Sequence, residues 1–189
     1  MTTTQVDKNL KIISVHIPKC AGTSFLNWLK DAFGQASVLQ DYDDKPMDPS
    51  SICNMDPVSH KQKVIQNFSQ ISNGKKVVHG HFLASKYDFI PNYKITFLRN
   101  PIERALSNYF YWMSVPVTNN KLHEYVVNNN LEWEDFVSLP IISKIYSGLF
   151  FENIDMKTFD FIGDCAIFED ELQRFGGGAW CLREIGSFK

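Results

Sequence analysis

The stretch KIISVHIPKCAGTSFLNWLKDAF, residues 11–33, decides the fold. Residues 11–17 are short, apolar and β-branched, which is typical of a buried strand. Residues 18–22 form a turn. Residues 23–33 then carry apolar side chains at helical spacing as far as Gly34, a residue that favours the end of a helix. The stretch predicts a strand, a loop and a helix, the opening unit of a layered α/β fold.

Three further strands are predicted, over residues 76–79, 93–98 and 159–163, each a short run rich in apolar or β-branched residues. We therefore expect a P-loop-like three-layer α/β fold, in which a central, mostly parallel sheet is flanked by helices. Residues 35–54 are rich in Asp, Ser and Pro and are predicted to be a loop. Further helices are predicted over residues 57–71, 101–113, 131–139, 141–149 and 169–175, the last one interrupted at Gly176.

The helix after the third predicted strand has a clear start. Asn100 favours an N-cap and Pro101 suits the first helical position. The apolar residues that follow recur at helical spacing, so we expect them to form the face that packs on the core. These residues are Ile102, Ala105, Leu106, Tyr109, Phe110 and Met113.

The composition favours one globular domain over residues 1–189, because 44% of the residues are hydrophobic. The formal net charge of −2 gives the whole molecule no attraction to nucleic acid or to an anionic membrane, so we expect neither as a partner. There is no run of about 18 apolar residues to span a membrane. Residues 1–10 lack an apolar signal-peptide core, which favours a cytoplasmic protein.

The cysteines show no CxxC spacing, so the sequence predicts neither a zinc site nor a redox pair, and we expect free thiols. They are Cys20, Cys53, Cys165 and Cys181.

The loop after the first strand suits an anion. Gly22 allows the backbone to approach a ligand closely, and Thr23 and Ser24 stand where a helix begins and its free N–H groups point outward. Thr23 and Ser24 alone are more typical of a helix cap than of an anion site. Lys19, together with Gly22, favours a cradle for phosphate or sulfate. The loop is not a Walker A motif, because Lys19 precedes Gly22, which argues against a nucleotide kinase.

Arg99 ends the third predicted strand, and ligands of open α/β sheets bind at the carboxyl ends of strands. An arginine can hold a phosphate with two hydrogen bonds, and Ser107, about two turns into the next helix, can add another. The alternative is that Arg99 pairs with Glu103 and that Ser107 faces solvent.

His79 and His81 flank Gly80 at the end of another strand. Alternate residues of a strand share a face, so both imidazoles can point to one side, where Gly80 leaves room. Imidazole suits proton transfer near neutral pH. The alternatives are structural histidines, or half of a metal site, which no further His or Cys at ligand spacing completes. We expect no metal.

These three segments resemble the PAPS-dependent sulfotransferases, where PAPS is the sulfate donor 3′-phosphoadenosine 5′-phosphosulfate. Residues 16–24 (HIPKCAGTS) are similar to that family's 5′-phosphosulfate loop, residues 97–107 (FLRNPIERALS) to its 3′-phosphate segment, and residues 78–82 (VHGHF) to the segment with its catalytic histidine. The resemblance covers roughly residues 12–169 and is closest to the carbohydrate 2-O-sulfotransferase-like branch.

The resemblance implies that PAPS is the donor substrate, that PAP is the product, and that the acceptor is a hydroxyl group of a carbohydrate or a small molecule. It implies His81 as the base, with Lys19 and His79 as further catalytic residues. The implied donor-binding residues are Lys19, Cys20, Ala21, Gly22, Thr23, Ser24, Arg99 and Ser107. Cys20 stands where the family commonly has threonine, and the family usually continues further at the C-terminus, so we expect a shortened domain.

Two other functions stay open: a PAP- or PAPS-binding protein with little catalysis, and a P-loop-like nucleotide kinase. Four aromatic residues are candidates for a sugar or aromatic-alcohol site, although aromatic residues at helical spacing more often belong to the core. They are Tyr109, Tyr111, Trp112 and Trp133.

Overall fold

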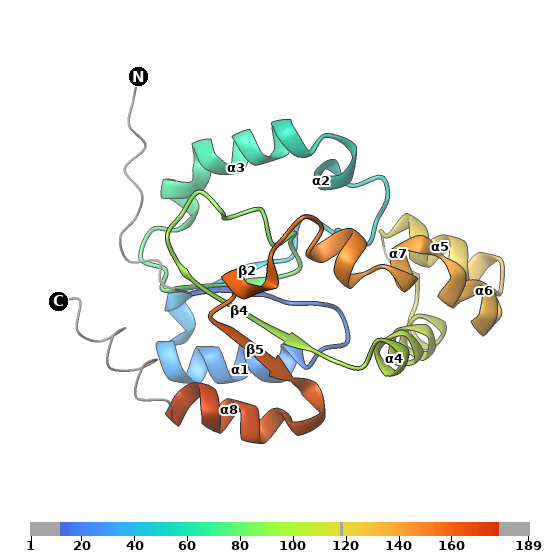
Figure 1. Ribbon diagram of the computed structural model, residues 1–189. Helices are drawn as coiled ribbons and strands as arrows, with labels where there is room; N and C mark the ends of the chain where they lie inside the picture. Colours follow the sequence, from blue (N-terminus) through green and yellow to red (C-terminus); the bar gives the residue numbers. More distant parts are fainter. Residues whose placement is uncertain (1–11, 118, 178–189) are drawn as a thin grey trace.

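Five parallel strands form the central sheet of the computed structural model, which describes residues 12–117 and 119–177. The order across the sheet is β2-β3-β1-β4-β5. Helix α3 covers one side of the sheet, and α1 and α8 lie on the other (Figure 1). The predicted three-layer α/β fold is thus confirmed. The strands are β1 (Ile12–Val15), β2 (Val38–Asp41), β3 (Val77–Gly80), β4 (Tyr93–Leu98) and β5 (Phe161–Asp164).

The helices differ widely in length, and α4 to α7 gather at one end of the molecule (Figure 1). Helix α8 includes Gly176 and Gly177, so it continues past the interruption predicted at Gly176. The helices are α1 (Gly22–Phe33), α2 (Ile52–Met55), α3 (Pro57–Ile71), α4 (Pro101–Ser114), α5 (Lys121–Asn128), α6 (Trp133–Ser138), α7 (Pro140–Ser143) and α8 (Phe168–Gly177). Four short turns complete the fold: η1 (Gln35–Ser37), the π-helical η2 (Tyr146–Phe150), η3 (Met156–Thr158) and η4 (Cys165–Ile167).

Strand β1 is buried on both faces, which explains its unbroken apolar run. Ile12 belongs to the core beneath α1, with Phe25 and with Phe175 of α8. Its neighbour Ile13 belongs to the core on the opposite face, with Phe68 of α3. Because successive side chains of a strand alternate in direction, one short strand joins the two cores.

The prediction of a loop over residues 35–54 is wrong for residues 38–41, which form β2, and for residues 52–54, which begin α2. This strand pairs in parallel with β3 from Val38 opposite Val77 to Asp41 opposite Gly80. It is an edge strand of four residues, and Gln40 is exposed. An edge strand needs no long apolar run, so β2 leaves almost no periodic signal in the sequence.

Gly80 is required by the approach of β2. A Cβ atom at this position would lie 1.7 Å from the carbonyl oxygen of Asp41. The room expected beside the two histidines is therefore occupied by the backbone of the edge strand.

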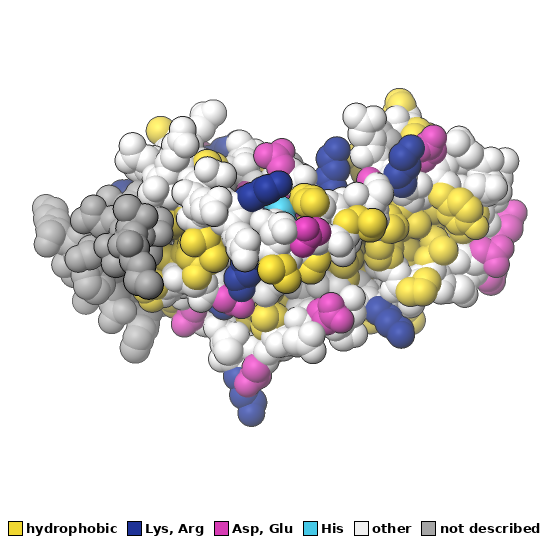
Figure 2. All heavy atoms as spheres, turned by 90° about the horizontal axis from the view of Figure 1, so that it is seen from above, with side chains coloured by type: hydrophobic (Ala, Val, Ile, Leu, Met, Phe, Trp, Pro, Cys, Tyr) yellow, Lys and Arg dark blue, Asp and Glu magenta, His cyan; other side chains and the backbone are white. Residues whose placement is uncertain are grey.

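The predicted start of α4 is confirmed, because the side-chain oxygen of Asn100 accepts hydrogen bonds from the N–H groups of Ile102 and Glu103. The predicted core face of α4 is wrong for four of its six members. Ile102, Leu106, Phe110 and Met113 are 70%, 41%, 61% and 40% exposed. The helix instead buries Arg104, Ala105, Asn108 and Trp112. Figure 2 shows hydrophobic side chains gathered at the end of the molecule that α4 to α7 build.

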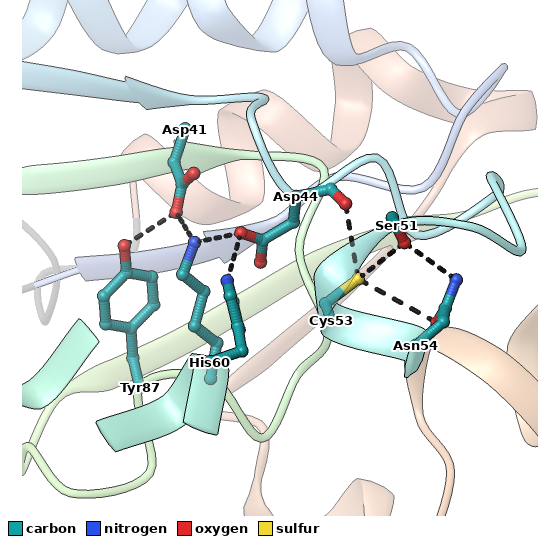
Figure 3. A network of polar contacts seen from close by, with 8 residues as sticks. Asp41, Asp44, Ser51, Cys53, Asn54, His60 and Tyr87 are labelled. Atoms are coloured by element: carbon teal, nitrogen blue, oxygen red, sulfur yellow. Dashed lines mark hydrogen bonds and ion pairs between the residues drawn. The ribbon is translucent and has the colours of Figure 1, made fainter. Parts of the chain in front are cut away.

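A buried network of charges fixes the chain that leaves β2 (Figure 3). The Lys86 ammonium lies 2.7 Å from a carboxylate oxygen of Asp41 and 2.7 Å from one of Asp44. The Tyr87 hydroxyl donates to Asp41 at 2.7 Å, and Nε2 of His60 lies 2.9 Å from Asp44. Because these contacts hold residues on both sides of Tyr42, they set the position of that residue at the carboxyl edge of the sheet.

The three described cysteines, Cys20, Cys53 and Cys165, are free thiols, and Cys181 lies outside the described residues. Within residues 12–117 and 119–177, none of the helices combines the length and the apolar character needed to cross a membrane.

Candidate active site

The carboxyl ends of β1, β3 and β4 open into one cavity of about 530 Å³, which α4 closes on one side. In a parallel sheet these ends lie at the same edge, so three segments far apart in the sequence meet there. The cavity lining contains eight of the predicted site residues: Lys19, Ala21, Gly22, Thr23, Ser24, His81, Arg99 and Ser107.

The loop between β1 and α1 has the backbone of an anion site. Lys19 and Ala21 both adopt left-handed conformations, with φ of 70° and 54°. Such strain in residues other than glycine costs about 1–3 kcal/mol each and concentrates at ligand clamps. Ala21 provides no side-chain cap, and the first turn of α1 carries no acidic residue. The positive end of the helix is therefore free to face an anion.

Gly22 is required for a steric reason. A Cβ atom there would lie 1.8 Å from both Cε1 and Nε2 of His16. The imidazole of His16 therefore lies directly against the loop backbone.

Cys20 belongs to the loop, but its side chain points away from the cavity. The thiol is 1% exposed, and Sγ lies 3.6 Å from the hydroxyl of Tyr146. The N–H of Cys20 donates to the carbonyl of Ile17 at 3.1 Å. A hydrogen bond from Cys165 is the main cause that lowers the pKa of the Cys20 thiol. The structure thus assigns Cys20 to the support beneath the loop.

Lys19 and Arg99 face the cavity from different segments. Nζ of Lys19 lies 4.1 Å from the centre of the Tyr111 ring on α4, a cation–π contact. Burial, and to a smaller extent the positive charge of Arg99, lower the pKa of Lys19. Nε of Arg99 lies 3.3 Å from Glu103, so the ion pair considered from the sequence is present. That pair engages Nε, and the outer fork of the guanidinium stays available to an anion.

Helix α4 presents polar groups to the cavity beside Arg99. Ser107 is half-buried and lines the cavity together with Asn108. Asn108 is 1% exposed, and its Nδ2 has no hydrogen-bond partner among the described residues. The buried polar face of α4 is therefore the wall of the site.

His79 and His81 do point to the same side of β3, but they occupy different places. His79 is buried behind the cavity wall, and its Nδ1 lies 2.8 Å from Oγ of Ser14. His81 is half-buried and lines the cavity. Within the described part of the chain, Nε2 of each histidine is buried without a hydrogen-bond partner.

Burial keeps these imidazoles neutral at pH 7. It lowers the pKa of His81 to about 4, and burial together with His81 lowers the pKa of His79 to about 3. The pKa of His16 is lowered well below its usual range by burial first, then by His81 and His79. An imidazole that is neutral at pH 7 is in the form that accepts a proton.

The sequence did not reveal several other residues of the lining, including His16, Tyr42, Lys45, Asn108 and Asn120. Tyr42 and Lys45 follow β2, and because this strand was not predicted, their place in the lining was not predicted either. Of the four candidate aromatic residues, Tyr111 and Trp112 line the cavity, whereas Tyr109 and Trp133 pack around Phe136. No group of three His, Cys, Asp or Glu in residues 12–117 and 119–177 is arranged to hold a metal ion.

Comparison with solved structures gives distant similarities. The crystal structure of mouse sulfotransferase SULT7A1 in complex with PAP has 15% sequence identity and a TM-score of 0.41, over 70% of this chain and 41% of that chain. This chain thus spans about two fifths of the length of SULT7A1. An uncharacterized protein from Eubacterium ventriosum has 12% identity and a TM-score of 0.42, over 90% of this chain and 99% of that chain.

Among curated proteins, none matches the sequence. The family model described as "Sulfotransferase family" matches residues 2–146, well over half of the chain. The matched range includes the loop of residues 16–24, which we call the anion loop, the HGH segment of residues 79–81 and the segment from Arg99 to Ser107. On this match the chain belongs to the sulfotransferase family.

Proposed function

We propose that this protein transfers a sulfuryl group from PAPS to a hydroxyl acceptor. The observation that carries the proposal is the single cavity in which the anion loop, Lys19, Arg99 and His81 converge. An anion loop alone would suit many nucleotides. A second cationic point after β4 and a neutral imidazole after β3, on opposite sides of the loop that follows β1, fit a donor with two charged ends and a proton to be removed.

The proposed donor site has two parts. The N–H groups at the start of α1, with Thr23 and Ser24, hold the 5′-phosphosulfate. Arg99 and Ser107 hold the 3′-phosphate, where the guanidinium fork supplies charge-assisted hydrogen bonds. Cys20 contributes through the loop that it supports rather than through its thiol.

In the proposed reaction the acceptor hydroxyl attacks sulfur in line with the bond to the bridging oxygen. A new S–O bond forms, the bond from sulfur to the bridging oxygen breaks, and PAP leaves with that electron pair. His81 takes the hydroxyl proton, and Lys19 stabilises the charge that develops on the bridging oxygen. In this reaction Lys19 either leaves its contact with Tyr111 or reaches the bridging oxygen while it stays next to that ring. His79 supports His81 from behind the cavity wall.

The proposed acceptor is a carbohydrate hydroxyl, in agreement with the similarity to the 2-O-sulfotransferase-like branch. Tyr42 and Tyr111 line the cavity and offer aromatic surfaces against which a sugar ring can pack, whereas the Trp112 ring is buried and stacked on His123. A small alcohol is the alternative acceptor. We also propose a single domain and a cytoplasmic location, with PAPS as the donor and no nucleic acid as a partner.

Calorimetry with PAP and then with ATP and Mg²⁺ tests the donor site before any acceptor is known. PAP is expected to bind, and ATP to bind more weakly. Stronger Mg²⁺-dependent binding of ATP would favour a nucleotide kinase and contradict the proposal. Transfer of labelled sulfate from PAPS to a panel of oligosaccharides and small alcohols then separates an enzyme from a binding protein with little catalysis.

His81→Ala tests the proposed base. Turnover is expected to fall about 10²- to 10⁴-fold, the usual contribution of a general base, while PAP affinity is retained. Unchanged turnover would exclude His81 as the base. Lost PAP binding in a folded variant would move His81 to the donor site.

A further inference from the structure

The imidazole of His16 lies between the anion loop and His81. On one side its Cε1 and Nε2 fill the space where a Cβ atom of Gly22 would lie, 1.8 Å from each. On the other side its ring centre is 4.4 Å from that of His81. A third side stacks on His79, with ring centres 5.2 Å apart and an interplanar angle of 14°. The ring of His16 therefore contacts both the loop and the proposed base.

The sheet register explains why these rings meet. Ser14 pairs with His79 and Val15 with Gly80, so His16 continues the ladder beside His81. The N–H of His16 donates to the carbonyl of Gly80 at 2.8 Å, which extends the pairing past the end of β1. Since paired residues on neighbouring strands point to the same face, His16 and His81 lie side by side.

Tyr42 closes the remaining edge of the cluster. Its ring meets that of His81 edge to face, with centres 4.8 Å apart, and its hydroxyl lies 3.5 Å from Nδ1 of His16. Burial raises the pKa of Tyr42 to about 12, so the phenol keeps its proton beside Nδ1 of His16. His16 is thus confined by the loop and by three neighbouring rings, those of Tyr42, His79 and His81.

We propose that His16 is a positioning residue, whose ring fills the space between Gly22 and His81 and so fixes the base relative to the donor loop. The proposal rests on the proposed sulfuryl transfer, in which His81 is the base. A base displaced by about 1 Å can lose about 10²-fold in rate, so a rigid spacer at this place matters for turnover.

Removal of the ring would also change the solvation of His81. His16→Ala leaves a space next to His81 into which water can enter, and hydration stabilises the charged imidazole. The pKa of His81 is therefore expected to rise from about 4 toward 6.5, by at least about one unit. The titratable groups that face this cluster are His79 on β3, Tyr42 after β2 and, acting on His79, Lys30 of α1.

His16→Leu is the conservative variant, because leucine fills a similar volume and excludes water but carries no nitrogen. It is expected to keep the pKa of His81 low and to retain most of the turnover that His16→Ala loses. Ile13→Val, a buried packing change on the same strand, controls for a general loss of stability. PAP binding should survive in all three, because the N–H of Cys20 already bonds Ile17 within the loop.

The experiment uses the complete chain, labelled with ¹⁵N and saturated with PAP. Imidazole resonances in long-range ¹H–¹⁵N spectra are followed from pH 7.5 to pH 4.5, and the signal missing in His81→Ala assigns His81. The wild type, His16→Leu and Ile13→Val are expected to show no titration of His81 above pH 5, whereas His16→Ala titrates. Turnover with labelled PAPS and an acceptor that the wild type accepts is measured on the same samples.

An unshifted His81 titration in folded His16→Ala would overturn the positioning role. The positioning role would also be overturned if His16→Leu lost as much turnover as His16→Ala while its His81 stayed neutral. Turnover would then depend on the nitrogen atoms of His16 and not on the volume of its ring. If His81→Ala itself keeps full turnover, the proposed base fails, whatever the His16 variants show. The two failures are therefore distinguishable.

Discussion

Gly22→Ala is the smallest change that should disturb both the loop and the histidine cluster. The added Cβ would lie 1.8 Å from Cε1 and Nε2 of His16 and 2.2 Å from its Cδ2. Carbon atoms in contact lie about 3.5–4.0 Å apart, so the ring or the loop must move by about 1.7–2.2 Å. The ring cannot yield easily, because His79 and His81 lie against it.

The expected loss of stability follows from that overlap. Overpacking of this kind typically costs about 1–3 kcal/mol. For a chain of this length, 1 kcal/mol lowers Tm by about 2–4 °C, so Gly22→Ala should unfold about 2–12 °C below the wild type. PAP affinity should fall as well, since the displaced backbone carries the proposed 5′-phosphosulfate contacts. Thermal unfolding and calorimetry with PAP measure the two effects.

The double variant Gly22→Ala/His16→Ala identifies the clash as the cause. Without the ring the new methyl group has room, so the double variant should lose less stability than the sum of the single losses. Gly177→Ala is the matched control, because a Cβ there meets no atom within 4 Å. An unchanged Tm and unchanged PAP affinity in Gly22→Ala would refute the steric reasoning, as would strictly additive losses in the double variant.

Other variants test the remaining contacts. Arg99→Ala is expected to weaken PAP binding about 10- to 150-fold, for a charged contact worth about 1.5–3 kcal/mol. Glu103→Gln, which releases Arg99 from its ion pair, should keep or raise the PAP affinity. Equal PAP affinities of Arg99→Ala and the wild type in calorimetry would contradict the 3′-phosphate role. Lys86→Met should lower the free energy of unfolding in urea by about 3–5 kcal/mol, because it leaves two carboxylates buried without their cation. Asp44→Asn should lower the free energy of unfolding by less than Lys86→Met does, because burial already raises the pKa of Asp44 and disfavours its charge. A larger loss of stability in Asp44→Asn than in Lys86→Met would contradict this reasoning. His79 has a pKa of about 3 in the fold but takes up a proton below about pH 6.5 in the unfolded chain, so its contribution to stability is present above that pH and is lost as the pH falls toward 4. Between pH 7 and pH 4.5, Tm should therefore fall less in His79→Asn than in the wild type. An identical fall in the two proteins would assign the pH dependence to other groups.

The central strands could be predicted from the sequence because burial on both faces leaves an apolar run. Ile12 and Ile13 are both fully buried, and each faces a different core. Edge strand β2 has no such requirement, since it pairs on one side only. Because β2 was not predicted, the place of Tyr42 in the cavity lining was not predicted either, since Tyr42 directly follows the end of β2.

The lining of the cavity could be predicted in part because several groups have a local signature. Lys19, Gly22 and Ser24 stand between a strand and a helix, and Arg99 stands at a strand end. The role of His16 has no local signature. It depends on β1 lying next to β3 with Ser14 opposite His79, a pairing between residues 65 positions apart that no periodicity encodes.

Helix α4 shows why hydrophobic periodicity fails next to a polar cavity. The method assumes that the apolar face of a helix packs on the core. In α4 the inward face borders the cavity, so Arg104, Ser107 and Asn108 lie on that side. Arg104 is fully buried and donates through Nη2 to the carbonyl of Ile142 at 3.1 Å, which ties the wall of the cavity to α7. In α4 the apolar pattern of the sequence therefore disagrees with the observed burial where polar groups line the cavity. Such disagreement is expected at a candidate functional site.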